Sequence, residues 1–322
     1  MEHIPRVSVA HLPTPVEPLR YLSTELGINL FIKRDDLTGL AFGGNKIRKL
    51  EFLVADAQAS GARTLITTGA LQSNHCRQTA AIAARCGLDC ILVLVGEAPK
   101  EMSGNLLLDH LLGAEFYWTS VEKRDESLQM IFERAQAEYR EPYLIPYGGS
   151  NRVGATAFAL AMKEVMEQAV NPDWVVIPSS SGGTQAGMVV GAQLYNFQGE
   201  ILGISIDTPE AELCLRVADL ATQTAGFLGS EKLITADAIK VSADYLGDGY
   251  GKPGVLEINA IGTFSRKEGI FLDPVYTGRA AGGMLDLAEK GYFKTGETVL
   301  FWHTGGTPAL FAETYQPMLQ NI

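Results

Sequence analysis

The sequence has few of the residues on which disulfide frameworks and metal centres depend. Its 322 residues include four cysteines and five histidines. The cysteines, Cys76, Cys86, Cys90 and Cys214, are too few and too irregularly spaced for a disulfide framework or a zinc knuckle. The histidines show no metal-ligand spacing either. We therefore expect no metal centre.

Long apolar runs and clusters of positive charge are also missing. No run approaches the roughly 20 apolar residues that cross a bilayer, and the N-terminal stretch MEHIPRVSVAHLPTPVEPL has no apolar signal region. With 26 Lys and Arg against 37 Asp and Glu, the net charge of −11 repels nucleic acids and anionic membranes. We expect a cytoplasmic protein with a small-molecule ligand and no nucleic-acid or membrane partner.

What the sequence does contain is an alternation of short β-rich runs and helical stretches. Strands are expected at 30–33, 64–68, 90–95, 144–146, 174–178, 201–206 and 298–302, and helices at 45–60, 73–85, 103–112, 155–168 and 187–196. This alternation predicts an α/β protein with parallel sheets covered by helices. The length favours two lobes, a smaller one at 49–149 inserted into a larger one at 1–48 and 150–322.

Residues 43–49, GGNKIRK, follow one expected strand and open a helix. Glycines at such a place let the backbone approach a ligand closely. A lysine in the first helical turn is unusual, because that end of the helix dipole prefers anions. The three cations predict either a desolvated amine beside an anion or a solvated basic face, and the segment does not match a Walker A loop.

Two other strand-to-helix loops have small, hydroxyl or amide side chains. Residues 69–75, GALQSNH, could present donors to an anion such as a carboxylate, although Ser and Asn are also ordinary helix caps. Residues 179–187, SSSGGTQAG, have the form of a phosphate cradle, and the alternative is a flexible glycine turn. GxGxxG is absent here, so a single phosphate is expected rather than a dinucleotide. A phosphorylated aldehyde captured by the lysine would unite these loops around one ligand.

Five segments resemble the D-cysteine desulfhydrase and aminocyclopropane-carboxylate deaminase family. They are FIKRDDLTGLAFGGNKIRKLEFL, ITTGALQSNHCRQTAA, SSSGGTQAG, EGIFLDPVYTGRAAGGM and HTGGTPALF, in the family's order along nearly the whole chain. The resemblance implies the two-lobed tryptophan-synthase-β-like fold (fold type II), with twisted parallel sheets covered by helices. It also implies pyridoxal 5′-phosphate (PLP) as the cofactor, a small amino acid as the substrate, and a homodimer.

The resemblance further implies roles for single residues. Lys46 would hold PLP as a Schiff base and move the substrate Cα proton, and Asn74 would bind the phenolic oxygen of PLP. Tyr276 would stack near the pyridine ring, and Thr277 would meet its nitrogen. Other cofactor-binding residues would be Ser181, Gly182, Gly183 and Thr184 at the phosphate, together with Thr304. The substrate would contact Ser73, Asn74, His75, Gln72 and Tyr250, with Lys46, Ser73 and Tyr276 as the catalytic residues.

Two positions separate the branches of the family. Ring-opening deaminases resemble one another in having a Glu after the tyrosine and a Leu before the final glycine pair, where this chain has Thr277 and Thr304. A carboxylate keeps the pyridine nitrogen protonated and deepens the electron sink, whereas a hydroxyl leaves it largely neutral and suits expulsion of a β-leaving group. The resemblance thus favours α,β-elimination, with D-cysteine giving pyruvate, sulfide and ammonia.

Three alternatives stay open from the sequence. The first is an aminocyclopropane-carboxylate deaminase, which would form 2-oxobutyrate and ammonia. The second is an L-cysteate sulfo-lyase, because Lys252 stands where an apolar residue is expected and could face a sulfonate or merely the solvent. The third is a binding protein that has lost catalysis, although such a protein has no need of the Lys46 amine.

Overall fold

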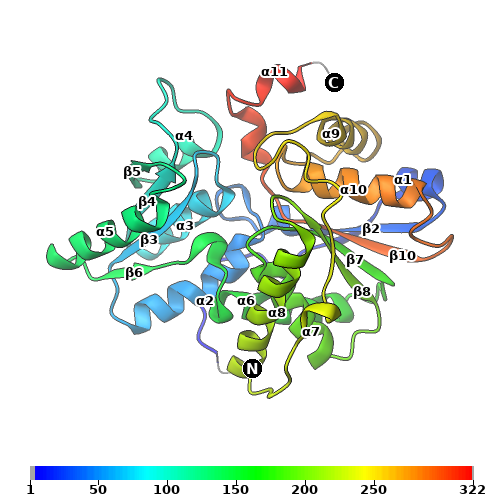
Figure 1. Cartoon of the computed structure of the whole chain (residues 1–322), viewed down its shortest axis with the longest axis horizontal. Coiled ribbons are helices and arrows are strands. Elements are labelled where there is room, and N and C mark those ends of the chain that lie inside the picture. The colour runs from blue at the N-terminus through cyan, green and yellow to red at the C-terminus, as the bar shows by residue number, and fades with distance from the viewer. Residues whose placement is uncertain (1–3, 321–322) are drawn as a thin grey trace.

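Two sheets organise residues 4–320, the part of the chain that the computed structural model describes (Figure 1). The larger sheet has the strand order β1-β2-β10-β7-β8-β9, and the smaller has the order β5-β4-β3-β6. Neighbouring strands are parallel throughout except for β1 and β2. The strands are β1 (Val16–Pro18), β2 (Asn29–Arg34), β3 (Thr64–Ala70), β4 (Asp89–Val95), β5 (Glu115–Thr119), β6 (Pro142–Leu144), β7 (Trp174–Ser179), β8 (Glu200–Ser205), β9 (Lys240–Ser242) and β10 (Thr298–His303).

Helices separate most of these strands and cover both sheets. Continuous apolar runs such as CILVLV in β4 are typical of parallel strands that are buried on both faces. The helices are α1 (Arg20–Leu26), α2 (Lys46–Ala59), α3 (Asn74–Cys86), α4 (Gly104–Leu111), α5 (Arg124–Ala137), α6 (Arg152–Glu167), α7 (Gly183–Leu194), α8 (Glu210–Phe227), α9 (Val255–Glu268), α10 (Thr277–Glu289) and α11 (Gln316–Leu319). The expected α/β architecture with parallel sheets is confirmed.

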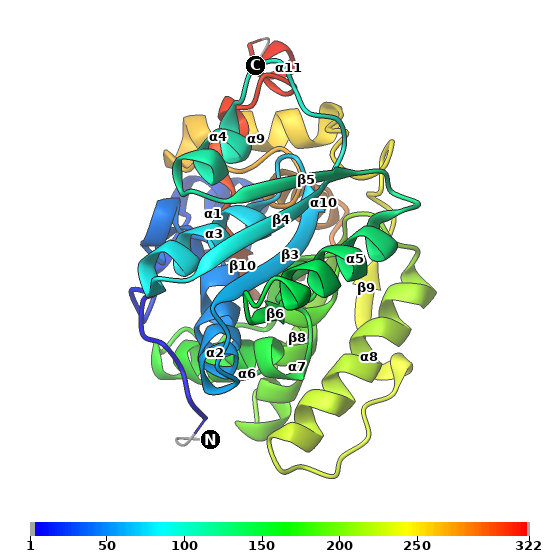
Figure 2. The same cartoon turned by 90° about the vertical axis from the view of Figure 1, so that its left-hand side faces the viewer.

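Each sheet lies between two helical layers (Figures 1 and 2). Side chains of α1, α9 and α10 pack on one face of the larger sheet, and those of α2, α6 and α7 on the other. In the smaller sheet, α3 and α4 cover one face and α5 the other. Helix α2 contributes Leu50 and Leu53 to the core of the smaller sheet and Phe52 to that of the larger one. Its first residue, Lys46, therefore lies at the junction of the two sheets.

The structure corrects several expected boundaries. The strand expected at 144–146 is β6, which lies two residues earlier, and the helix expected from 187 begins at Gly183. Helix α6 begins at Arg152 rather than 155, because Asn151 caps its first turn by accepting the Gly154 amide. The expected lobe bounds, 49–149 within 1–48 and 150–322, stay a prediction, and α2 crosses the first of them.

Candidate active site

A cavity lies among the loops that follow β2, β3, β6, β7 and β10, at the carboxyl ends of parallel strands. Ligand sites of open α/β sheets lie at such strand ends. Of the residues expected in a site, the cavity wall contains Lys46, Ser73, Asn74, His75, Ser181, Gly182, Thr184, Tyr276 and Thr304. These residues come from both sheets and are far apart in the sequence, so the fold brings most of the expected site together.

Lys46 is the first residue of α2, and its side chain reaches this cavity. Among residues 4–320, no hydrogen bond or ion pair holds its amine. Burial lowers the pKa of Lys46 from 10.5 to about 8, because a charged amine is poorly solvated there. About a tenth of the amine is therefore unprotonated at about pH 7, and the unprotonated form is the one that attacks an aldehyde.

The loop between β7 and α7 has features that suit an anion at the start of α7. Gly182 caps this helix with a φ of 81°, a left-handed conformation that favours glycine. The first-turn amides of α7 have no acceptor within the helix and leave positive potential at its end. Ser181 Oγ lies 2.8 Å from Ser150 Oγ, and Thr184 Oγ1 accepts from Asn45 at 3.2 Å.

Lys49 lies beside the start of α7, behind the cavity wall. Its fully buried amine donates to the Gly148 carbonyl and to Ser150 Oγ, each at 3.2 Å. A Cβ placed on Gly183 would lie only 2.9 Å from this amine, so the cation lies against the start of α7. Burial and the nearby Lys46 lower the pKa of Lys49 well below its usual value. A bound dianion would supply the missing counter-charge and favour the protonated form of the amine.

The start of α3 also lines the cavity, and its first-turn amides suit an anion. Ser73 is the N-cap, with a side chain that accepts the Cys76 amide at 3.2 Å. The capping interpretation of Ser73 is thus confirmed, and the residue still lines the cavity. Asn74 accepts from Asn105 Nδ2 at 2.9 Å through its side-chain oxygen, which leaves its NH₂ group for a ligand.

His75 lines the same cavity in a defined neutral form. The Thr67 hydroxyl donates its proton to the Ile145 carbonyl at 2.9 Å, so it accepts from His75 Nε2, also at 2.9 Å. Burial and the charges of Lys46 and Lys49 lower the pKa of His75 well below its usual value. His75 Nδ1 is therefore a buried acceptor, and it has no partner among the described residues.

Tyr276 and Tyr250 form a hydroxyl pair beside the cavity. Their oxygens lie 2.7 Å apart, and their rings meet edge to face. Burial raises the pKa of both phenols well above the usual value, so both keep their protons at neutral pH. Tyr276 lines the cavity, whereas Tyr250 and Gln72 line an adjoining cavity of about 310 Å³. Tyr147, which the sequence analysis did not select, also lies in the main cavity wall.

The two threonines that separate the family branches lie in different surroundings. Thr277 is fully buried, and its hydroxyl donates to Asp273 Oδ1 at 2.8 Å while accepting the Asp273 amide at 2.6 Å. It is absent from the described wall of the cavity, where Thr304 is present. Lys252 is exposed and lines neither this cavity nor the adjoining one.

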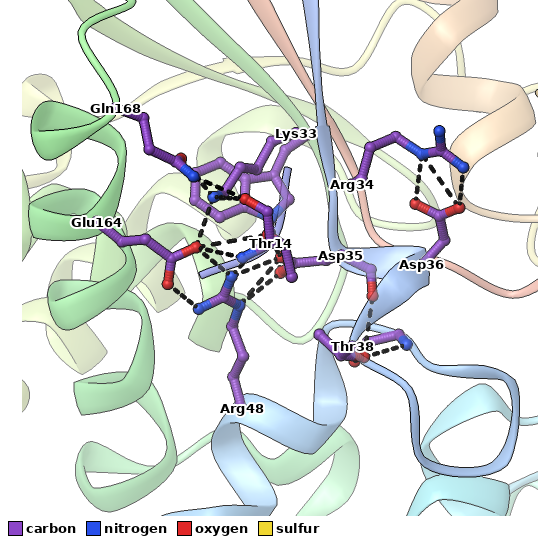
Figure 3. A network of polar contacts seen from close by, with 11 residues as sticks. Thr14, Lys33, Arg34, Asp35, Asp36, Thr38, Arg48, Glu164 and Gln168 are labelled. Atoms are coloured by element: carbon purple, nitrogen blue, oxygen red, sulfur yellow. Dashed lines mark hydrogen bonds and ion pairs between the residues drawn. The ribbon is translucent and has the colours of Figure 1, made fainter. Parts of the chain in front are cut away.

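A buried charge network holds the segment that contains Lys46 (Figure 3). Arg48 pairs with Asp35 and with Glu164, each at 2.8 Å, and Lys33 pairs with Glu164 at 2.5 Å. Trp302 donates its indole N–H to Asp35 at 2.8 Å. These contacts tie α2 to β2, β10 and α6, so they fix the helix on which Lys46 lies.

The fold and this site define a lysine-dependent cofactor enzyme, and comparison with known proteins agrees. The model of the family described as pyridoxal-phosphate dependent enzymes matches residues 7–305, and the chain belongs to this family. Its cofactor is PLP. The buried Lys49 amine beside the start of α7 fits a phosphate group at this place. So does the buried Ser179 hydroxyl, which has no hydrogen-bond partner within residues 4–320.

The chain is similar to individual members of the family over its whole length. It is 42% identical to D-cysteine desulfhydrase of Klebsiella pneumoniae (strain 342), over 99% of this chain and 98% of that protein. A crystal structure of an ACC deaminase homologue is 38% identical with a TM-score of 0.91, over 99% of this chain and 97% of the other. The processed form of threonine deaminase isoform 2 from Solanum lycopersicum shares the fold, with a TM-score of 0.69, 17% identity and coverage of 97% and 83%.

These comparisons confirm the family resemblance, the two-lobed PLP fold and the cofactor expected from the sequence. No helix within residues 4–320 is long and apolar enough to cross a membrane. The same residues contain no cluster of three or more His, Cys, Asp or Glu side chains that could hold a metal ion.

Proposed function

We propose that this enzyme catalyses α,β-elimination from a small amino acid, with D-cysteine giving pyruvate, sulfide and ammonia. The observation that carries the proposal is the 42% identity over the full chain to a D-cysteine desulfhydrase. The cavity agrees with it, because its wall contains Lys46 together with two helix N-termini that suit the substrate carboxylate and the cofactor phosphate.

In this proposal, three groups of residues hold the cofactor. The start of α7, with Ser181, Thr184 and the Lys49 cation, binds the phosphate. The NH₂ group of Asn74 donates to the phenolic oxygen. Thr304 donates to the ring nitrogen, since the hydroxyl of Thr277 is engaged by Asp273.

PLP supplies an electron sink at the substrate Cα when it is bound. The Lys46 amine, with its lowered pKa, takes the Cα proton. The first-turn amides of α3 orient the substrate carboxylate beside Ser73. Tyr276, which keeps its phenolic proton, donates a hydrogen bond to the departing sulfur.

Ring opening of aminocyclopropane carboxylate is the second candidate, because the solved homologue with 38% identity is described as an ACC deaminase homologue. Against it stand Thr277 and Thr304, which provide no carboxylate at the ring nitrogen. A cysteate sulfo-lyase is less well supported, since the exposed Lys252 lies outside both cavities. The buried, unpaired amine of Lys46 disfavours a binding protein without catalysis.

The test is to measure the release of pyruvate, 2-oxobutyrate, sulfide and sulfite from D- and L-cysteine, cysteate and aminocyclopropane carboxylate. We expect pyruvate and sulfide from D-cysteine to exceed every other activity. Thr304→Glu should depress this elimination and raise 2-oxobutyrate formation, because a carboxylate beside the ring nitrogen keeps that nitrogen protonated. If the wild type opens aminocyclopropane carboxylate as fast as it releases sulfide from D-cysteine, the assignment to the desulfhydrase branch is wrong. The assignment to PLP-dependent enzymes would still hold.

We also propose that the enzyme is a cytoplasmic homodimer, as the family resemblance implies. All four cysteines are unpaired, in agreement with a reducing compartment. Leu111 on α4 and Phe311 on the adjacent turn, 70% and 67% exposed, provide apolar surface for a second copy. A sedimentation mass of one chain at micromolar concentration would contradict the dimer.

A further inference from the structure

Asn105, on α4, is buried and makes hydrogen bonds through every polar atom of its side chain. Its Oδ1 accepts from Arg77 Nη1 at 2.8 Å. Its Nδ2 donates to the Gln72 carbonyl and to Asn74 Oδ1, both at 2.9 Å. Asn105 itself lies outside the described cavity wall.

The orientation of the two asparagine amides follows from the chemistry of Arg77. A guanidinium has five N–H donors and no acceptor. Burial lowers the pKa of Arg77 only to about 10, so it stays a cation and a pure donor at neutral pH. Asn105 must therefore direct its oxygen to Arg77 and its NH₂ group to Asn74. In turn, Asn74 must direct its oxygen to Asn105.

The remaining NH₂ group of Asn74 then points into the active site. A Cβ placed on Gly306 would lie 2.6 Å from Asn74 Nδ2, so this nitrogen faces the glycine turn that follows Thr304. Asn74 thus offers the cavity a donor and no acceptor. Arg77 also donates to the Gly43 carbonyl at 2.7 Å, just before the Lys46 segment, so one cation anchors both sides of the cofactor site.

We infer that Asn105 is a positioning residue that sets the polarity of Asn74, so that Asn74 donates to the phenolic oxygen of PLP. This inference rests on the proposed role of Asn74. The donor suits an ionised phenolic oxygen, whereas a reversed amide would place its own oxygen against that anion. Asn105 acts through Asn74 and does not itself line the cavity.

Asn105→Asp tests the inference because it changes the polarity and keeps the shape. The new carboxylate still accepts from Arg77, but it presents an acceptor to Asn74, whose amide must then reverse. We expect PLP to bind the cofactor-depleted chain about tenfold to a hundredfold more weakly. The visible absorption of the remaining complex should move to shorter wavelength, since the phenolic oxygen is less readily ionised beside an acceptor.

Asn105→Ala separates polarity from packing. It leaves Asn74 able to turn either way, so the inference predicts a smaller loss of PLP affinity than Asn105→Asp. A packing role predicts the reverse order, because alanine leaves a cavity and aspartate nearly fills the site. Asn196→Asp adds the same charge where the side-chain oxygen already accepts from Gln198, and should leave PLP affinity unchanged.

Two further measurements complete the test. Urea unfolding of each variant without PLP reports whether the fold is kept, and only folded variants are compared. Asn74→Ala tests the proposed function separately. Unchanged PLP affinity in Asn74→Ala would refute the role of Asn74. If Asn74→Ala loses PLP affinity but Asn105→Asp changes neither PLP affinity nor the visible absorption, the role of Asn105 alone is refuted.

Discussion

Arg48 and Lys49 are neighbours on α2, both are buried, and their electrostatic surroundings are opposite. Arg48 lies between the carboxylates of Asp35 and Glu164 (Figure 3). Lys49 donates only to uncharged oxygens, and no carboxylate within residues 4–320 forms an ion pair with it. A buried cation without a counter-charge is unfavourable unless a ligand supplies one. The charge of Arg48 therefore stabilises the fold, whereas Lys49 is suited to a bound anion.

Helix geometry explains the division. Successive residues of an α-helix are about 100° apart, so Lys46 and Lys49 lie on one face and Arg48 on another. Lys46 lines the cavity, and Lys49 lies behind the cavity wall, where it donates to the Gly148 carbonyl. Arg48 faces Asp35, which follows β2, and Glu164 on α6. The same basic segment thus places Lys46 in the cavity wall and fixes the helix through Arg48.

Lys46→Ala removes the reactive amine and has the largest expected effect on activity. We expect pyruvate and sulfide formation to fall about a thousandfold or more, because proton transfer by Lys46 is lost together with the bond to the cofactor. The visible absorption of bound PLP should change at the same time. The control is Lys163→Ala, which alters an exposed lysine. Near-normal turnover in Lys46→Ala would remove this residue from the mechanism.

Glu164→Gln breaks the structural network. Arg48 keeps Asp35, but Lys33 loses its only carboxylate partner in the described structure, so we expect the free energy of unfolding to fall by about 3–5 kcal/mol. PLP affinity of the folded variant should change less than threefold. Urea unfolding and PLP titration measure the two effects. Glu167→Gln, which alters an exposed pair on the same helix, should change stability by about 0.5 kcal/mol or less.

Lys49→Met should change PLP affinity rather than stability, the reverse of Glu164→Gln. The variant loses a charged contact to the phosphate, and PLP affinity should fall about tenfold to a hundredfold. The free energy of unfolding of the chain without PLP should stay the same or rise, because a buried amine that has no counter-charge is replaced by an apolar side chain. Inorganic phosphate should protect the wild type against urea but not this variant. Equal protection of both would show that phosphate binds away from Lys49.

The sequence predicted the loops of the site better than the direction of its side chains. The segments GGNK and SSSGGTQAG stand out because glycines and hydroxyls follow apolar runs, and the structure brings both to one cavity. Lys49 was missed because the basic segment was considered as a whole. Its spacing of three residues from Lys46 was the available signal, since such residues share a helix face.

Other features depend on contacts that hydrophobic periodicity does not predict. The engagement of the Thr277 hydroxyl by Asp273 follows from the local path of the chain before α10. The edge strands β1, β5 and β9 were missed. β1 and β9 have three residues each, which are too few to show alternation. The amide orientation of Asn74 depends on Arg77 through Asn105, a chain of contacts that only the folded structure reveals.

The rate of PLP capture should depend on pH, and this is the smallest of the expected effects. It tests whether Lys46 is as poorly solvated as its place in the cavity wall implies. Only the unprotonated Lys46 amine can attack the aldehyde, and its pKa is lowered to about 8. The capture rate should therefore rise about fivefold between about pH 7 and pH 8 and level off near pH 9. A lysine with the ordinary pKa of 10.5 would still gain about tenfold per pH unit over this range. Stopped-flow absorbance after mixing PLP with the cofactor-depleted chain measures the rate.

Pyridoxine phosphate, which lacks the aldehyde, serves as the control, and its binding should not follow this profile. A capture rate that still climbs tenfold above pH 9 would mean that Lys46 is as well solvated as a surface lysine.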